Sequence, residues 1–292
     1  MSNLSILSSS VIVFTHVPKS AGCTFGEAFV QAIKPNRPLF GFDLSLFGGF
    51  KEFEACSSEV RATIFQSTDA VPTNADFVGG HFSFATTKAV FPQARHIMIL
   101  REPTARLLSL WVFWRGQPDV ELDRWAGWGD IVRLSHLSLE TFLEKPEAAC
   151  NTDNAYIRAL LYGHPLVPID GFIEERHDQA ILEDAKRILT AYAYIDILEN
   201  ANIEKCLEAF MLRPFRMKRI NETSNVSEQR RTDLHREFTS TALSAMARRT
   251  RLDNRLWDYV GRRSREPSEL VSLRTVTIMT TVARYSHLLA GV

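Results

Sequence analysis

A single lysine stands in a loop of small residues near the N-terminus, between an apolar run and a run with helical spacing. The stretch reads VIVFTHVPKSAGCTFGEAFVQAI and covers residues 11–33. A helix N-terminus offers unpaired N–H groups and a positive dipole end, glycine lets the backbone approach a ligand, and lysine adds a point charge. The residues that supply these groups are Lys19, Ser20, Ala21, Gly22, Cys23 and Thr24. They can wrap a phosphate group, although a tight strand-to-helix turn would require small residues as well.

An arginine and a serine further along the chain form a second pair with the same chemistry. In HIMILREPTARLLSLW, residues 96–111, Arg101 leaves an apolar run directly into a turn, and Ser109 follows it in a run with helical spacing. A charged side chain beside a buried strand is costly unless a partner compensates its charge. The planar guanidinium and the hydroxyl can converge on one phosphate. The alternative is a structural arginine that binds a carbonyl and an ordinary helix serine.

The elements that must position these residues follow from hydrophobic periodicity. Strands are expected at residues 11–15, 76–78, 96–100 and 194–198, and a loop with an apolar patch at 40–53. Helices are expected at residues 25–33, 104–115, 139–143, 154–161, 178–190 and 203–210, and over most of 230–259. Strands that alternate with helices predict an α/β fold, with a mainly parallel central sheet flanked by helices on both faces. Ligands bind such sheets beyond the carboxyl ends of the strands, which is where residues 16–24, 79–81 and Arg101 are expected.

Composition limits the classes of partner and compartment. Lys+Arg and Asp+Glu are equal at 34 each, so no net field attracts the 292-residue chain to nucleic acid. The four cysteines include no close pair, which excludes zinc ribbons and CxxC redox motifs and suits a reducing compartment. There is no apolar run of about eighteen residues, and the N-terminus lacks the basic region of a signal peptide. These features predict a cytoplasmic protein with no membrane span and no metal site.

The order of the motifs resembles that of the PAPS-dependent sulfotransferases, which use 3′-phosphoadenosine 5′-phosphosulfate (PAPS). The matching segments are HVPKSAG at 16–22, GGHF at 79–82 and LREP at 100–103, with Arg106 and Ser109 in register. The resemblance is closest to the carbohydrate type, which includes the heparan sulfate 2-O-sulfotransferases. It implies a three-layer P-loop-like fold and a single sulfotransferase domain over residues 1–292. The PAPS-binding motifs would lie in 11–115, and the acceptor-binding and closing segments in 116–292.

The resemblance also implies roles for individual residues in binding PAPS. Lys19 matches the lysine near the oxygen that bridges phosphate and sulfur, and residues 20–24 match the loop that wraps the phosphate. Arg101 and Ser109 match the pair at the 3′-phosphate. Arg219 lies in a late segment that matches a loop closing over the nucleotide. Cys23 departs from the family, which usually has serine or threonine there, so a hydroxyl donor is lost.

Further matches imply the base and the acceptor contacts. His81 matches the histidine proposed as the base in the 2-O-sulfotransferase branch, and its alternative is a buried histidine that completes a strand end. The residues assigned to substrate binding are His16, Asn151, Asn154 and Arg158. A structural role is the alternative for His16. The other three would share a helix face by their spacing, with a solvated face as the alternative.

The expected reaction is the transfer of a sulfuryl group from PAPS to a hydroxyl, with His81 as the base and Lys19 neutralising the leaving oxygen. The acceptor would be a saccharide or glycoconjugate and the enzyme bacterial, and the oligomeric state is open. One rival is a P-loop-like kinase or NTPase, but the loop lacks the GxxxxGK[ST] spacing and its lysine precedes the glycine. The other rival is a non-catalytic nucleotide-binding relative, for which Cys23 leaves room.

Overall fold

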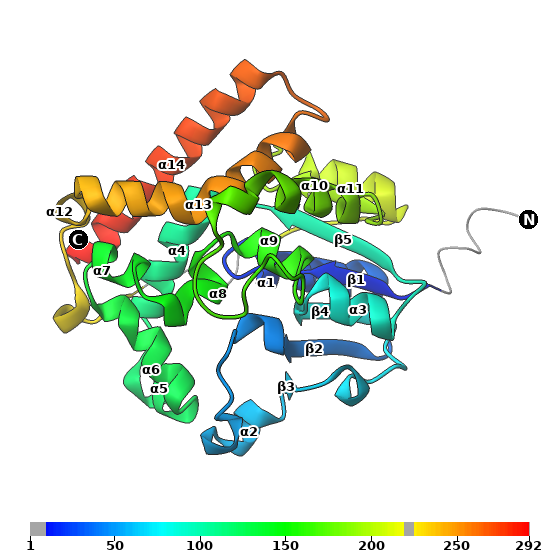
Figure 1. The fold of residues 1–292 in the computed structure, drawn as a ribbon. Helices are drawn as coiled ribbons and strands as arrows, with labels where there is room; N and C mark the ends of the chain where they lie inside the picture. The colour runs from blue at the N-terminus through cyan, green and yellow to red at the C-terminus, as the bar shows by residue number, and fades with distance from the viewer. Residues whose placement is uncertain (1–9, 219–224, 292) are drawn as a thin grey trace, which may run out of the picture.

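The computed structural model describes residues 10–218 and 225–291, and its centre is a parallel sheet (Figure 1). The strands in the described residues are β1 (Ile12–Thr15), β2 (Pro38–Asp43), β3 (Ile64–Phe65), β4 (Phe77–His81), β5 (Arg95–Leu100) and β6 (Tyr194–Ile197). They run in the order β3-β2-β4-β1-β5-β6, and each neighbouring pair is parallel. The carboxyl ends of β1, β4 and β5 therefore meet at one edge, because β1 lies between the other two.

Helices cover both faces of the sheet and extend beyond its carboxyl edge. The helices in the described residues are α1 (Gly22–Ile33), α2 (Ser58–Arg61), α3 (Phe84–Val90), α4 (Pro103–Arg115), α5 (Asp119–Arg124), α6 (Gly127–Arg133), α7 (Leu139–Leu143), α8 (Ala149–Thr152), α9 (Ala155–Leu160), α10 (Asp178–Leu189), α11 (Ile203–Met211), α12 (Leu234–Glu237), α13 (Ser240–Gly261) and α14 (Pro267–Ala290). Strands and helices alternate along the first half of the chain, so the expected α/β class is confirmed.

Separate apolar clusters hold the layers together. On one face, Phe25 and Phe29 of α1 pack with Phe14 of β1 and with Leu207 of α11. On the other face, Met98 of β5 packs in a cluster that includes side chains of α9, α10 and α13. A third cluster lies beyond the sheet and combines α4, α6, α7 and the end of α14. The arrangement has three layers, with the sheet between two layers of helices.

The structure corrects the loop expected at residues 40–53. Residues 40–53 are not a loop throughout, because β2 occupies Pro38–Asp43 and its side chains alternate between exposed and buried positions. Pro38 is the first residue of the strand, where its missing N–H is tolerated. Most of residues 230–259 is helical, as expected: α12 comes first, and α13 begins after Thr239, whose side chain accepts a hydrogen bond from the N–H of Ala242.

Candidate functional site

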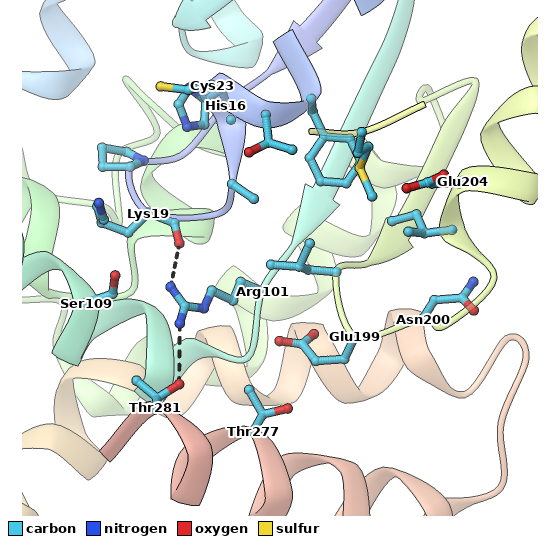
Figure 2. Close-up of a pocket in the computed structure, with 18 of the residues that line it drawn as sticks. His16, Lys19, Cys23, Arg101, Ser109, Glu199, Asn200, Glu204, Thr277 and Thr281 are labelled. Atoms are coloured by element: carbon cyan, nitrogen blue, oxygen red, sulfur yellow. Dashed lines mark hydrogen bonds between the residues drawn. The ribbon is translucent and has the colours of Figure 1, made fainter. Parts of the chain in front are cut away.

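A cavity of about 1060 Å³ opens at the carboxyl edge of the sheet (Figure 2). Its walls come from the β1–α1 loop, the ends of β4 and β5, the segment from β6 into α11, and one face of α14. The sequence-predicted residues that line it are His16, Lys19, Ala21, Gly22, Cys23, Thr24, His81, Arg101 and Ser109. The two motifs singled out for phosphate chemistry therefore face one cavity.

The β1–α1 loop is held in a backbone conformation that side-chain-bearing residues rarely adopt. Lys19 has φ 70° and Ala21 has φ 60°, and Ala21 is the N-cap of α1. Such strain persists only where surrounding contacts fix it, and it is common at ligand sites. A side chain at Gly22 would overlap the imidazole of His16, so glycine is required there. The loop thus turns directly into the N-terminus of α1, which faces the cavity.

Ser20 differs from the other loop residues in where its side chain lies. It is buried, its hydroxyl donates to the carbonyl of Val17 at 2.8 Å, and it does not line the cavity. The hydroxyl of Tyr156 lies 3.2 Å from the Ser20 hydroxyl. The side chain of Ser20 therefore braces the loop from behind, and its N–H is also used inside the loop, where it donates to the Val17 carbonyl at 3.2 Å.

Lys19 contributes an ammonium group with a lowered pKa to the cavity. Its Nζ lies 3.9 Å from the centre of the Phe113 ring, a favourable cation–π contact. Burial and the nearby charge of Arg101 lower the pKa of Lys19 from 10.5 to about 8. The ammonium is still mainly protonated at neutral pH, and an anion placed between Lys19 and Arg101 would relieve their repulsion.

Arg101 joins the phosphate loop to the C-terminal helix. Its Nη1 donates to the carbonyl of Lys19 at 3.1 Å and its Nη2 to the hydroxyl of Thr281 at 3.4 Å (Figure 2). Its own N–H donates to the hydroxyl of Tyr156 at 2.7 Å. Ser109, on α4, is buried and shares a 2.7 Å hydrogen bond with the hydroxyl of Tyr285. The hydrogen bonds of the Arg101 guanidinium go to neutral oxygen atoms, its charge also interacts with the Glu199 carboxylate, and the side chains of Arg101 and Ser109 both face the cavity.

The turn after Arg101 starts α4 in a regular way. Glu102 is buried at the N-cap, where its carboxylate accepts a hydrogen bond from the N–H of Ala105, and Pro103 occupies the first turn. Arg274 of α14 forms an ion pair with Glu102 at 3.6 Å. Glu102 therefore caps α4 and pairs with α14 at the same time.

His81 lies at the end of β4, and one of its ring nitrogens is already hydrogen-bonded. Its Nδ1 is 2.8 Å from the carbonyl oxygen of His16, which can only accept, so Nδ1 carries the proton. The lone pair is therefore on Nε2. The ring is sandwiched between His16, at 4.3 Å between ring centroids, and Phe42, at 5.5 Å. Burial lowers the pKa of His81 to about 4, so the imidazole is neutral at pH 7.

The glycines before His81 set its position. Gly80 has φ +120°, and a side chain on it would overlap the backbone of Gly41 in the neighbouring strand. A side chain on Gly79 would come within 2.9 Å of the Phe40 ring. The two glycines therefore let β2 and β4 approach closely, and β4 extends through His81 rather than ending at the expected residue 78.

Three residues assigned to substrate binding have structural partners instead. They do not share a helix face, because the chain breaks between α8 and α9, and Asn154 there has φ 50°. The side chain of Asn151 donates to the carbonyl of Leu46, and the side-chain Oδ1 of Asn154 accepts from the N–H groups of Leu252 and Asp253. Arg158 pairs with Asp153 at 2.8 Å. All three are buried and none lines the cavity, so the expected helix face is wrong.

Other cavity residues were missed in the sequence. They are Phe113, residues 198–201, 203–205 and 208, Arg216 and Met217, and Thr277, Thr280, Thr281, Arg284 and Tyr285 of α14. The residues on α14 recur at helical spacing and include three threonines and an arginine, a pattern that the sequence shows but does not connect to the N-terminal loop. Arg219 lies outside the described residues.

No group of three or more His, Cys, Asp and Glu side chains in residues 10–218 and 225–291 is arranged to hold a metal ion. The four cysteines all lie in this part of the chain and form no disulfide. None of the described helices combines the length and the apolar character needed to cross a membrane.

Comparison with protein families gives one match that bears on this geometry. A model described as "Sulfotransferase family" matches residues 2–161, which is more than half of the chain. The match contains the loop around Lys19, the end of β4, and the Arg101–Ser109 segment. A comparison with curated proteins gives no match.

Proposed function

The chain belongs to the sulfotransferase family, and from that premise we propose that it transfers a sulfuryl group from PAPS to a saccharide hydroxyl. The observation that carries the proposal is the meeting of Lys19, the N-terminus of α1, Arg101 and Ser109 around one cavity. A nucleotide with phosphates at both the 5′ and 3′ positions requires two anion sites on one ligand. The chain offers both on a P-loop-like α/β fold.

The cavity has the parts that PAPS requires. The 5′-phosphosulfate would lie against the strained loop at residues 19–24, where the helix N-terminus favours an anion. The 3′-phosphate would lie by Arg101 and Ser109. Apolar side chains of Phe25, Leu198, Ile203 and Met217 line the same cavity and could hold the purine. The thiol of Cys23 lines the same part of the cavity, in the place of the family's usual hydroxyl.

The reaction would pass through His81 and Lys19. The acceptor hydroxyl oxygen bonds to sulfur as the bond from sulfur to the 5′-phosphate oxygen breaks, which leaves 3′-phosphoadenosine 5′-phosphate (PAP). Nε2 of His81 accepts the hydroxyl proton, since Nδ1 is already protonated. Lys19 stabilises the charge on the departing phosphate oxygen. The negative charge of the bound donor raises the low pKa of His81 and makes it a better base.

The acceptor and compartment belong to the proposal. The saccharide class follows from the resemblance to the branch with a histidine after two glycines. His16, which packs against both Gly22 and His81, is placed to orient the base and to border the acceptor. We propose a cytoplasmic enzyme built as a single domain over residues 1–292.

The test compares melting temperatures with PAP, 5′-AMP and Mg-ATP. A ligand at one hundred times its Kd adds about 2.7 kcal/mol, which corresponds to a rise of about 5 °C or more for a protein of this size. We expect a rise with PAP that is lost in Arg101→Ala and in Ser109→Ala, while 5′-AMP gives a smaller one. A rise with Mg-ATP but none with PAP would favour the kinase rival. Binding of PAP with no sulfate transfer from PAPS to any saccharide tested would favour the non-catalytic rival.

A further inference from the structure

The C-terminal helix α14 is fixed against the body of the protein at both ends. Leu270 is buried in the cluster that contains Trp257, and Tyr285 and Leu289 are buried in the cluster that contains Trp111. A capping box at Glu266 and Glu269 starts the helix. α14 lies wholly outside the residues matched by the family model, and it crosses beside α4 and α13 in Figure 1.

Between these ends, α14 turns several polar residues toward the cavity and leaves several large apolar residues exposed. The residues that line the cavity are Thr277, Thr280, Thr281, Arg284 and Tyr285, which recur at helical spacing on one stripe. The large apolar side chains Val271, Val276 and Met279 are 64%, 59% and 66% exposed. A helix that served only to cover the core would bury the apolar residues and expose the polar ones. The polar stripe therefore faces a space that can hold a polar ligand.

Side chains of this stripe bind the two residues proposed for the 3′-phosphate. Thr281 accepts from Arg101 at 3.4 Å, and Tyr285 shares its hydroxyl hydrogen bond with Ser109 at 2.7 Å. The guanidinium of Arg101 carries five N–H groups, of which its contacts with Lys19 and Thr281 use two. The remaining donors and the neighbouring hydroxyls can bind a phosphate oxygen without rearrangement of α14.

The stripe also brings a positive charge close to Lys19 and Arg101. Arg284 lines the cavity with Lys19 and Arg101, and its charge contributes to lowering the pKa of Lys19. The guanidinium lies 5.6 Å from the centre of its neighbour's ring, Tyr285. Lys19, Arg101 and Arg284 come from three separate elements, and an anion of high charge between them would relieve their mutual repulsion. A phosphate monoester carries up to two negative charges and fits that requirement.

We propose that α14 forms the second half of the 3′-phosphate site, in which Arg284 and Thr281 bind the phosphate opposite Arg101 and Ser109. The inference rests on the proposed use of PAPS. It makes α14 a determinant of specificity, since this helix would distinguish a nucleotide with a 3′-phosphate from one without it.

The test measures the Kd of PAP and of 5′-AMP by calorimetry, because the two ligands differ only in the 3′-phosphate. Loss of one hydrogen bond to a charged group weakens binding by about tenfold or more. We expect Arg284→Ala to raise the Kd of PAP by about tenfold and that of 5′-AMP by less than about twofold. Arg284→Lys, which keeps the charge, should recover part of the loss, and Thr281→Val should reduce the preference for PAP in the same direction.

Arg262→Ala is the matched control, since Arg262 is exposed at the end of α13 and does not line the cavity. It should leave both dissociation constants unchanged. Arg284 is also exposed, so its variants should keep the melting temperature of the free protein. If the wild type prefers PAP and Arg284→Ala keeps that preference, the role of α14 is wrong and the proposed function stands. If the wild type shows no preference for PAP, the proposed function and this inference both fail.

Discussion

At the scale of single residues, the site depends on how burial lowers the pKa of His81 and of Lys19. Burial holds His81 neutral, and its contact with the His16 carbonyl fixes which nitrogen can accept a proton. Burial and Arg101 bring the pKa of Lys19 to about 8. The arrangement separates a neutral base from a protonated lysine at pH 7, which is the combination that the proposed reaction needs.

The role of His81 predicts a loss of turnover without a loss of donor binding. His81→Ala should lower kcat by about 10²–10⁴ while the Kd of PAP stays the same, because the imidazole takes the proton and does not hold the nucleotide. Added imidazole should restore part of the rate. His235→Ala removes an exposed histidine and serves as the control. Full turnover in His81→Ala would show that His81 is not the base.

The role of Lys19 predicts an alkaline limb in the pH profile. A lysine is cationic below its pKa, so kcat/KM should fall as pH rises through about 8. The corresponding fall in kcat should occur at higher pH, because the bound anion raises the pKa of Lys19. In Lys19→Arg the limb should be absent, since guanidinium stays protonated. An unchanged limb in that variant would show that another group titrates.

At the scale of elements, α9 fixes the two segments proposed to bind phosphate relative to each other. The hydroxyl of Tyr156 accepts from the N–H of Arg101, lies 3.1 Å from the Arg101 carbonyl, and contacts the hydroxyl of Ser20. The start of α9 is held in turn by Asp253 of α13, whose carboxylate accepts from the N–H groups of Tyr156 and Ile157. One buried hydroxyl thus joins the loop after β1 to the turn after β5.

Tyr156→Phe should therefore affect both stability and nucleotide binding. The ring packing is kept, but the partly buried N–H of Arg101 loses its partner, which costs about 1–3 kcal/mol of unfolding free energy in urea titrations. The Kd of PAP should rise as well. Tyr192→Phe is the control: Tyr192 is also buried and bonds Thr15 within β1, so it should lower stability and leave the Kd of PAP unchanged. Equal affinities in the two variants would contradict the bracing role.

At the scale of the whole molecule, the cavity is assembled from the two ends of the chain. Residues 16–25 and 277–285 form opposite walls, and Arg101 lies between them (Figure 2). The net charge of the chain is zero, so attraction of an anionic nucleotide depends on this local gathering of cations rather than on a global field. The central sheet holds both walls in place.

This assembly predicts that PAP slows hydrogen exchange in both walls at once. Amides at the start of α1 and in residues 277–285 of α14 should gain protection when PAP is added, since ligand binding suppresses local opening. Helix α10 does not line the cavity and provides an internal reference. Protection confined to the start of α1 would place the nucleotide away from α14.

The sequence by itself determined the features that depend on near neighbours in the chain. The apolar runs at β1 and β5 predicted a parallel α/β sheet, and the residues after them, around Lys19 and at Arg101, were expected at one edge because parallel strands end together. β2 was missed because Pro38 and Gly41 mask a short alternating strand. The match at GGH could be seen, but the orientation of His81 could not.

Only the tertiary structure decided which distant segments meet. The spacing of Asn151, Asn154 and Arg158 indicated a helix face. In the structure, these residues are buried and form hydrogen bonds within the protein, to Leu46, α13 and Asp153. The stripe on α14 carries no local signal of its target, because a polar helix face looks the same whether it meets solvent or a cavity. Hydrophobic periodicity indicates which residues of a segment share a face. What each face contacts is determined by the packing of the whole chain.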